Sequence, residues 1–185
     1  NRMGPDGKVT SPLGNLGDGV RIVGLGGTDN TIGGLATGAG NTITHNGAGG
    51  VLVDYLNTGN QILSNAIYSN GGLGIDLTEG GLTGVSLNDV GDGDTGGGNN
   101  LQNYPVLSSV TVAGGNTTVA GTFNSTGNTM FLLQFFSNPV SDPTGYGEGH
   151  KLLTPVSGDT EVSTDAIGNS TFSFTFTGDF GKQFI

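Results

Sequence analysis

Three aspartates lie close together in the part of the chain that is best suited to bind a metal ion. Asp89, Asp92 and Asp94 fall within residues 78–100, a stretch rich in Gly, Asp and Asn. Hard cations such as Ca²⁺ bind oxygen ligands from carboxylates, amides and carbonyls, and a Gly-rich loop can wrap such an ion. The spacing does not fit an EF-hand, because DVGDGDTGGGNN ends without the required Glu. The chain therefore predicts Ca²⁺ at these three aspartates, and the alternative is a solvated turn whose Asp and Asn bond to local backbone.

A second calcium motif is only approximate. NGGLGIDLT (70–78) nearly matches the calcium-binding nonapeptide G-G-x-G-x-D-x-U-x. Thr78 stands where a large aliphatic residue belongs, and no tandem copy follows. We therefore interpret Asp76 as an outward-facing strand residue.

The two histidines give weak support for catalysis. His45 lies in THNG, which reads as a turn, and His150 follows Glu148 in a Gly-rich loop. A Glu148–His150 pair could exchange protons, but no Ser-His-Asp arrangement has local support. The sequence thus predicts no catalytic residue and no enzyme.

Composition limits the partners. The chain has 185 residues, 38 Gly, 5 Lys+Arg and 15 Asp+Glu, for a net charge of −10. So few cations argue against nucleic acid and against anionic lipid. The chain has no Cys, which excludes disulfides and thiolate metal sites. No apolar run is long enough for a membrane span. Sequons at Asn116, Asn124 and Asn169 would matter only in a glycosylating source.

A short phrase recurs three times and defines the elements. It reads NLGDGVRI (15–22), NGAGGVLV (46–53) and NGGLGIDL (70–77), with Asn, Gly and two aliphatics at equal offsets. Like positions are 51 − 20 = 31 and 75 − 51 = 24 residues apart. An Asn-x-Ile phrase recurs at Asn30, Asn41, Asn60 and Asn65, with an earlier copy suggested at 1–3.

This period favours three short strands in each turn of a parallel β-helix. Alternate residues should point inward, so Val20 and Ile22 should stack on Val51 and Val53, and these on Ile75 and Leu77. Equivalent Asn side chains should form hydrogen-bonded ladders. The longer first spacing is explained by extra residues in 32–40. An antiparallel sandwich would explain the alternation but not the equal offsets.

On the outer face, the same register predicts Arg21, Leu52 and Asp76 side by side. One Arg, one Leu and one Asp do not make a carboxylate cluster. Tyr55, in the loop that follows, could stack on a sugar but is more simply a surface residue.

The residues resemble a known family. LGNLGDGVRI (13–22), NTIGGLATGAGNTI (30–43) and GIDL…NDVGDGDTGGGNNLQNYPVL (74–107) are similar to right-handed parallel β-helix repeat proteins of the pectate-lyase-like superfamily. The resemblance implies about three to four coils that lead into an Ig-like module of large bacterial secreted or surface proteins. Polysaccharide lyases of this fold use clustered Asp for Ca²⁺ and an Arg or Lys base on an outer face, a set that the outer positions here do not reproduce.

The residue pattern changes in the second half of the chain. Alternating runs at 117–125, 129–138 and 161–178, separated by turns at 114–116 and 166–169, predict an Ig-like antiparallel β-sandwich. The expected domains are residues 1–100, closed by the acidic loop 78–100, and residues 101–185. We expect the chain to be truncated at both ends, so that a sandwich edge is left for a later strand or a neighbouring molecule.

The function predicted is a non-catalytic structural or adhesive module of an extracellular or cell-surface protein. Its expected partners are copies of itself, neighbouring domains of the same large protein, or glycans, with assembly into filaments or a surface layer. The alternative is a polysaccharide-binding or polysaccharide-degrading β-helix protein, recognised by a groove beside Arg21, Leu52 and Asp76. A third interpretation is a calcium-stabilised spacer.

Overall fold

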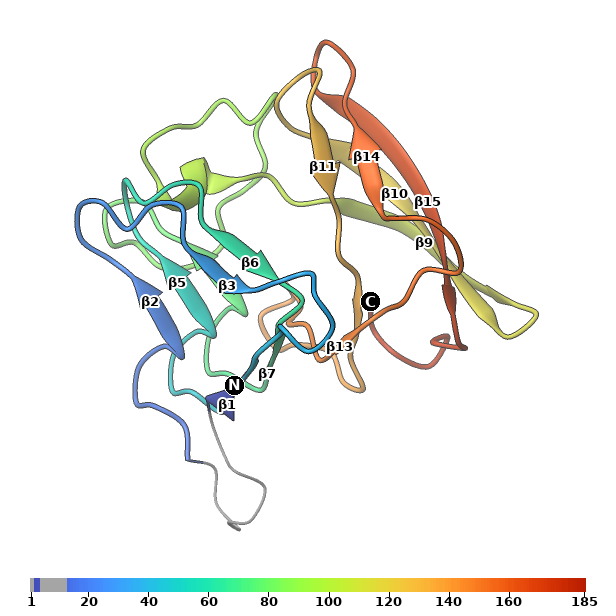
Figure 1. Cartoon of the computed structure of the whole chain (residues 1–185), viewed down its shortest axis with the longest axis horizontal. Coiled ribbons are helices and arrows are strands. Elements are labelled where there is room, and N and C mark those ends of the chain that lie inside the picture. Colours follow the sequence, from blue (N-terminus) through green and yellow to red (C-terminus); the bar gives the residue numbers. More distant parts are fainter. Residues whose placement is uncertain (1, 4–12) are drawn as a thin grey trace.

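The computed structural model describes residues 2–3 and 13–185, so Asn1 of the suggested early copy lies outside the described residues. The fold is all-β, and its only helical element in the described part of the chain is the 3₁₀ turn η1 (Gly98–Leu101). Parallel sheets occupy the first part of the chain and antiparallel sheets the second, and the two parts lie side by side (Figure 1). The predicted boundary at 100/101 falls inside η1, and it stays a prediction.

The first part winds through three parallel sheets, in the orders β2-β5-β8, β3-β6 and β1-β4-β7. We call one passage through the three sheets a coil, and the described residues 2–3 and 13–77 the coil stack. Its strands are β1 (Arg2–Met3), β2 (Val20–Ile22), β3 (Thr31–Gly33), β4 (Thr42–Thr44), β5 (Val51–Val53), β6 (Gln61–Leu63), β7 (Ala66–Tyr68) and β8 (Ile75–Leu77).

The register follows the repeat. Val20 pairs with Val51 and Val51 with Ile75, and two positions on, Ile22 pairs with Val53 and Val53 with Leu77. The predicted stacking is therefore confirmed. Most of its aliphatics form one core, although Ile75 of the last coil is 44% exposed. The buried members are Ile22, Ile43, Val51, Val53 and Ile67. Each such burial contributes roughly 1.5–3 kcal/mol.

The extra residues of the first coil also lie largely where the sequence predicts. Eight residues (34–41) join β3 to β4, whereas two (64–65) join β6 to β7. Another eight (23–30) join β2 to β3, against seven (54–60) from β5 to β6. These differences of six and one account for the excess of 31 over 24.

The second part has longer strands and an aromatic core. A three-stranded sheet has the order β15-β10-β9, and two smaller pairs, β11-β14 and β12-β13, lie beside it. Its strands are β9 (Val106–Ala113), β10 (Asn116–Asn124), β11 (Met130–Leu132), β12 (Phe136–Ser137), β13 (Lys151–Leu152), β14 (Glu161–Ser163) and β15 (Asn169–Thr177). Strict alternation in β15 buries Phe172 and Phe176 against Phe135 and Val119. The run 129–138, predicted as one strand, is two, because β11 pairs with β14 whereas β12 pairs with β13.

Candidate functional site

Three columns of Asn side chains hold the coils together, as predicted. We name each ladder by its first residue. In the Asn15 ladder, the Asn15 N–H donates to Asn46 Oδ1 (3.1 Å), and the backbone and side-chain N–H groups of Asn46 donate to Asn70 Oδ1 (3.1 and 2.9 Å). Because Asn46 is 3% exposed, an unmade bond there would leave a buried donor without a partner.

The other two ladders repeat this geometry. In the Asn30 ladder, Asn30 donates from its backbone N–H and its side chain to Asn60 Oδ1, at 3.1 and 2.8 Å. In the Asn41 ladder, Asn41 donates in the same way to Asn65 Oδ1, at 2.9 Å for both bonds. In each ladder, then, the Oδ1 of an Asn accepts from the equivalent Asn of the coil before it. The last coil therefore needs acceptors from elsewhere.

Glu148, from the antiparallel part, supplies the acceptor at the end of the Asn15 ladder. Its Oε1 accepts from the backbone N–H (3.0 Å) and from Nδ2 (2.9 Å) of Asn70. The next residue, Gly149, forms an antiparallel bridge with Ile67, with both N–H···O bonds at 2.7 Å. Glu148 therefore occupies the position that an Asn of another coil would take.

Two further residues close the remaining positions of the last coil. Gln134 accepts from the Ser64 N–H (2.8 Å) and donates to Ser64 Oγ (2.9 Å), one residue before the last Asn of the Asn41 ladder. Asn99, in η1 with φ +47°, accepts from the Asn60 N–H (3.0 Å) and donates to the Asn60 carbonyl (2.8 Å). We call Asn99, Gln134 and Glu148 the end cap.

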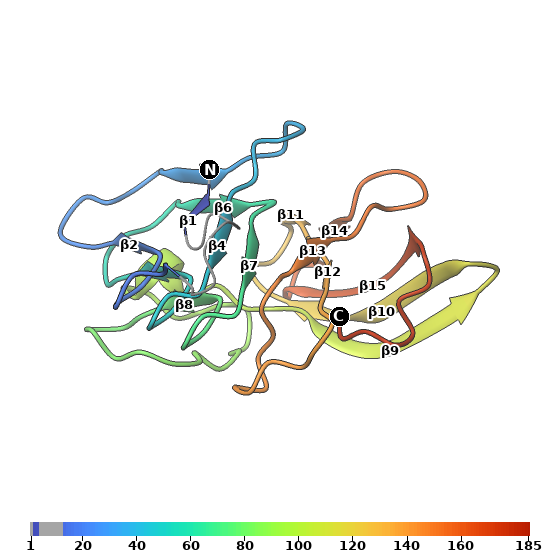
Figure 2. The same cartoon turned by 90° about the horizontal axis from the view of Figure 1, so that it is seen from below.

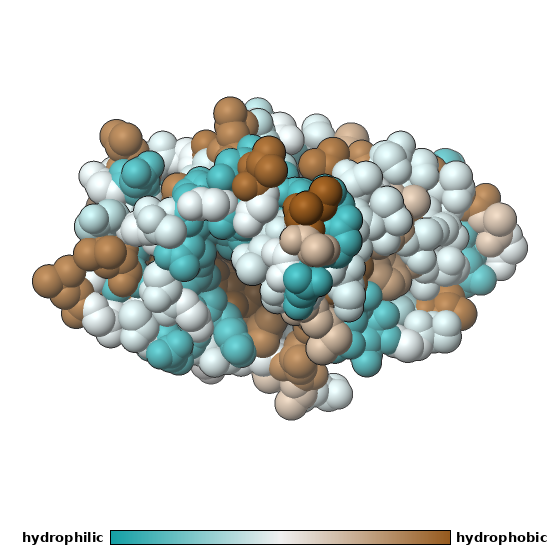
Figure 3. Space-filling view, turned by 90° about the horizontal axis from the view of Figure 1, so that it is seen from above, coloured by the Kyte–Doolittle hydropathy of each residue, from teal (hydrophilic) through white to brown (hydrophobic). Residues whose placement is uncertain are grey.

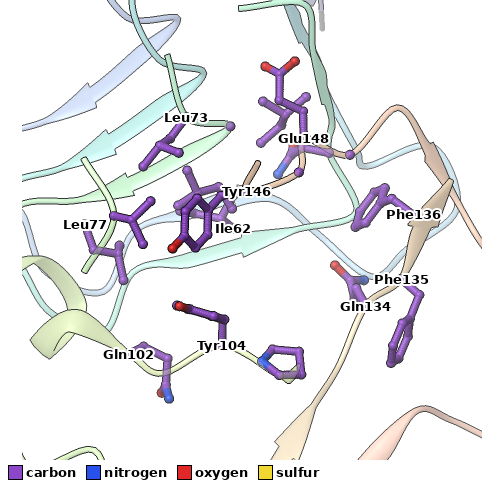
Figure 4. A pocket seen from close by; sticks show the side chains of 18 of the residues that line it. Ile62, Leu73, Leu77, Gln102, Tyr104, Gln134, Phe135, Phe136, Tyr146 and Glu148 are labelled. Carbon is purple, nitrogen blue, oxygen red and sulfur yellow. The ribbon is translucent and has the colours of Figure 1, made fainter. Parts of the chain in front are cut away.

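Beneath the end cap lies a largely apolar cavity of about 700 Å³. Figure 4 shows Leu73 and Leu77 of the coil stack on one side and Gln134 and Phe136 on the other. Tyr104 and Tyr146 reach in from separate segments, with ring centroids 6.1 Å apart at 80°. Partial burial, and then the neighbouring Tyr146, raise the pKa of Tyr104. Apart from the two phenols, most polar side chains of the lining are amides, and the one carboxylate, Glu148, bonds to Asn70.

The outer face of the β2-β5-β8 sheet differs from the expected open surface. Arg21, Leu52 and Asp76 do lie side by side, and the Arg21 side chain is 57% exposed. Leu52 and Asp76 are only 4% and 6% exposed, so the expectation that they face outward to solvent is wrong. The Gly84 N–H, in the loop after β8, bonds to both oxygens of Asp76 (3.3 and 3.1 Å).

The carboxylates around this face are already engaged. Asp18 pairs with Arg21 (3.4 Å) and accepts from the Gly49 N–H (2.8 Å). Burial, partly offset by the Gly84 bond, raises the pKa of Asp76. A hydrogen bond from Thr78 (2.7 Å), followed by one from the Tyr55 N–H, lowers the pKa of Asp54. These side chains hold loops to the coils, and the described face shows no open carboxylate pair.

The three aspartates of the predicted calcium site have different roles. The carboxylate of Asp92 accepts from Gln102 Nε2 (2.8 Å), the Asn103 N–H (2.9 Å) and Ser125 Oγ (2.7 Å), which ties the acidic loop to the end of β10. Asp89 accepts from the Gly93 N–H (3.0 Å).

Asp94 is the least satisfied of the three. Its Oδ1 is buried without a hydrogen-bond partner. Burial, and then the negative charge of Asp89, raise the pKa of Asp94. Among residues 2–3 and 13–185, no group of three or more His, Cys, Asp or Glu side chains is placed to hold a metal ion. Calcium at Asp89, Asp92 and Asp94 stays a prediction.

The remaining predicted residues lie in structural positions. His45 occupies a corner with φ +58°, and its Nδ1 lies 2.8 Å from Thr44 Oγ1. His150 packs edge-on against Tyr68, with centroids 4.2 Å apart, while Glu148 bonds to Asn70. Tyr55 is 46% exposed. The sequence pattern suggests Glu148 only as a partner for His150, and it holds no signal that Asn99 and Gln134 belong to an end cap.

No family model, curated protein or solved structure matches this chain. No helix of the described residues has the length and apolar character needed to cross a membrane. On the face in Figure 3, apolar side chains form separate spots among polar ones.

Proposed function

We propose that the chain is a non-catalytic structural module of an extracellular or cell-surface protein. In this proposal the coil stack is a right-handed parallel β-helix and the antiparallel part is an Ig-like β-sandwich that closes its end. The observation that carries the proposal is the use made of polar side chains. The Asn ladders, Asp18, Asp54 and Asp76 all bond within the fold, so the polar groups of the coil stack serve cohesion.

The end cap refines the expected mode of assembly. Unpaired coil ends allow solenoids to stack end to end, but Glu148 and Gly149 already occupy this end of the stack. A second coil stack would have to displace them. The module therefore acts as a closed rigid spacer at this end, and any self-assembly uses another surface.

The alternative of polysaccharide binding or cleavage has less support. Its expected groove would contain Leu52 and Asp76, which are buried, and Arg21 is paired with Asp18. Calcium supports the structural proposal only if Asp89 and Asp94 share an ion, which would relieve the unpartnered Asp94 Oδ1.

The test combines calorimetry with activity assays on the intact chain. We expect one cooperative unfolding transition, because the end cap couples the two parts, and no cleavage of acidic polysaccharides with or without Ca²⁺. Calcium-dependent polysaccharide cleavage that disappears in Arg21→Ala would overturn the structural proposal. Two separate transitions would refute the coupling but leave the absence of catalysis standing.

A further inference from the structure

Strand β9 is an open edge of the antiparallel sheet. It pairs with β10 on one side, and none of the described residues pairs with its other side. The opposite edge of the sheet is covered, because the Val156 N–H donates to the Thr175 carbonyl and the Thr177 N–H donates to the Thr154 carbonyl. In Figure 2, β9 lies at the outer margin of the antiparallel part. Free backbone N–H and C=O groups along such an edge can bind another β-strand.

The side chains of β9 favour pairing rather than protection. Val110 lies opposite buried Val119 and so belongs to the inner face of the sheet. Yet Val110 and Val112 are 42% and 39% exposed. Natural edges are blunted by charge, Pro or bulges; here Pro105 precedes β9, and a bulge interrupts its pairing near Ser108. Residues 109–113 carry no such device.

We propose that residues 109–113 of β9 bind the same segment of a second copy of this chain as an antiparallel pair centred on Thr111. Opposite residues of an antiparallel pair lie on one face. This register places Val110 of each copy opposite Val112 of the other copy. The pairing therefore contains two contacts between half-exposed valines.

Charge explains why a second copy is a suitable occupant. Each chain has a net charge of −10, which opposes association in general. Residues 95–141, however, contain no Asp, Glu, Lys or Arg. The two paired segments themselves therefore place no like charges opposite each other, and the Val-Thr-Val centre is symmetric about its own middle. The pairing is additional to the structural role proposed above and does not depend on it.

Because the chain has no Cys, single cysteines can test the register. In Thr111→Cys the two substituted residues would lie opposite each other, with Cα atoms roughly 4.5–5.5 Å apart, within disulfide reach. In the matched control Ala113→Cys, on the same face and also exposed, the two residues would be offset by four positions, or about 13 Å. That distance exceeds disulfide reach.

The experiment measures the mass of the wild-type chain by light scattering over a concentration series, and the rate of disulfide dimer formation by both variants with oxygen and copper–phenanthroline. We expect the mass to rise toward that of a dimer and Thr111→Cys to cross-link at least about tenfold faster than the control, both variants melting as the wild type does. A monomeric mass at all concentrations overturns the proposal. Equal cross-linking rates, or a faster Ala113→Cys, overturn the antiparallel register.

Discussion

The coil stack and the antiparallel part bury their apolar side chains and pair their polar groups in different ways. In the coil stack, three-residue strands bury small aliphatics such as Val51, and Asn side chains carry much of the polar bonding between coils. In the antiparallel part, nine-residue strands β10 and β15 pair along their whole length over a Phe-rich core. The antiparallel part takes most of its bonding from its own long strands. A coil is complete only when another layer satisfies its ladder, and for the last coil that layer comes from the antiparallel part.

The largest effect should come from the aromatic core. Phe176 is 0% exposed and contacts Phe135 (ring centroids 5.3 Å). Phe176→Ala should lower the free energy of unfolding by about 3–5 kcal/mol. Because the antiparallel part holds the end cap, the coil stack should lose stability with it, measured by urea denaturation with probes in both parts. The exposed control Phe184→Ala should change the free energy by less than about 0.5 kcal/mol. If Phe176→Ala left the stability of the coil stack unchanged, the coil stack would not depend on the antiparallel part.

A smaller loss should follow from breaking one ladder. Asn65 is 4% exposed, accepts two bonds from Asn41 and donates to the Ile32 carbonyl (2.8 Å). Asn65→Ala leaves these groups unpaired, which should cost about 1–3 kcal/mol in urea denaturation. Gln61→Ala, exposed on neighbouring β6, is the matched control and should be nearly neutral. Equal effects in the two variants would show that the ladder does not contribute to stability.

The smallest effect should be a dependence on pH with opposite signs at two aspartates. Burial raises the pKa of Asp76 above its ordinary value of 3.8. The folded chain therefore loses stability as the pH rises from 3.8 through the raised pKa, because the buried side chain must then carry a charge. Asp76→Asn should be more stable than the wild type at pH 7, with the gap gone below about pH 3.8.

Asp54 should show the pH dependence opposite to that of Asp76. The Thr78 bond lowers the pKa of Asp54 below 3.8, so its carboxylate adds stability above pH 3.8 that is lost as pH falls through the lowered pKa. Asp54→Asn should be less stable than the wild type at pH 7. Thermal melting of both variants between pH 2.5 and 7 checks the two signs, and a shift of the same sign in both would refute the assignment.

The sequence predicts the repeated features better than the single ones. The register of Val20, Val51 and Ile75 follows from equal offsets, because a stacked coil places equal offsets above one another. The burial of Asp76 depends on a bond from Gly84 in an irregular loop, for which the strand pattern holds no signal. Glu148 was predictable only as a polar loop residue. It is of a different type from the Asn that it replaces, and it lies 78 residues from Asn70.

Glu148 takes the place of the next Asn in the Asn15 ladder. The most direct measurement is hydrogen exchange of the Asn70 and Ile67 amides in the intact chain, comparing Glu148→Ala and Glu148→Gln with the wild type. Glu148→Ala removes a charged acceptor whose bond is worth about 1.5–3 kcal/mol, so the Asn70 amide should exchange roughly 10- to 150-fold faster. Glu148→Gln keeps an acceptor and should retain most of the protection, with the Ile67 amide, bonded to Gly149, following the same order. Unchanged exchange in Glu148→Ala, or equal loss in both variants, would contradict the account.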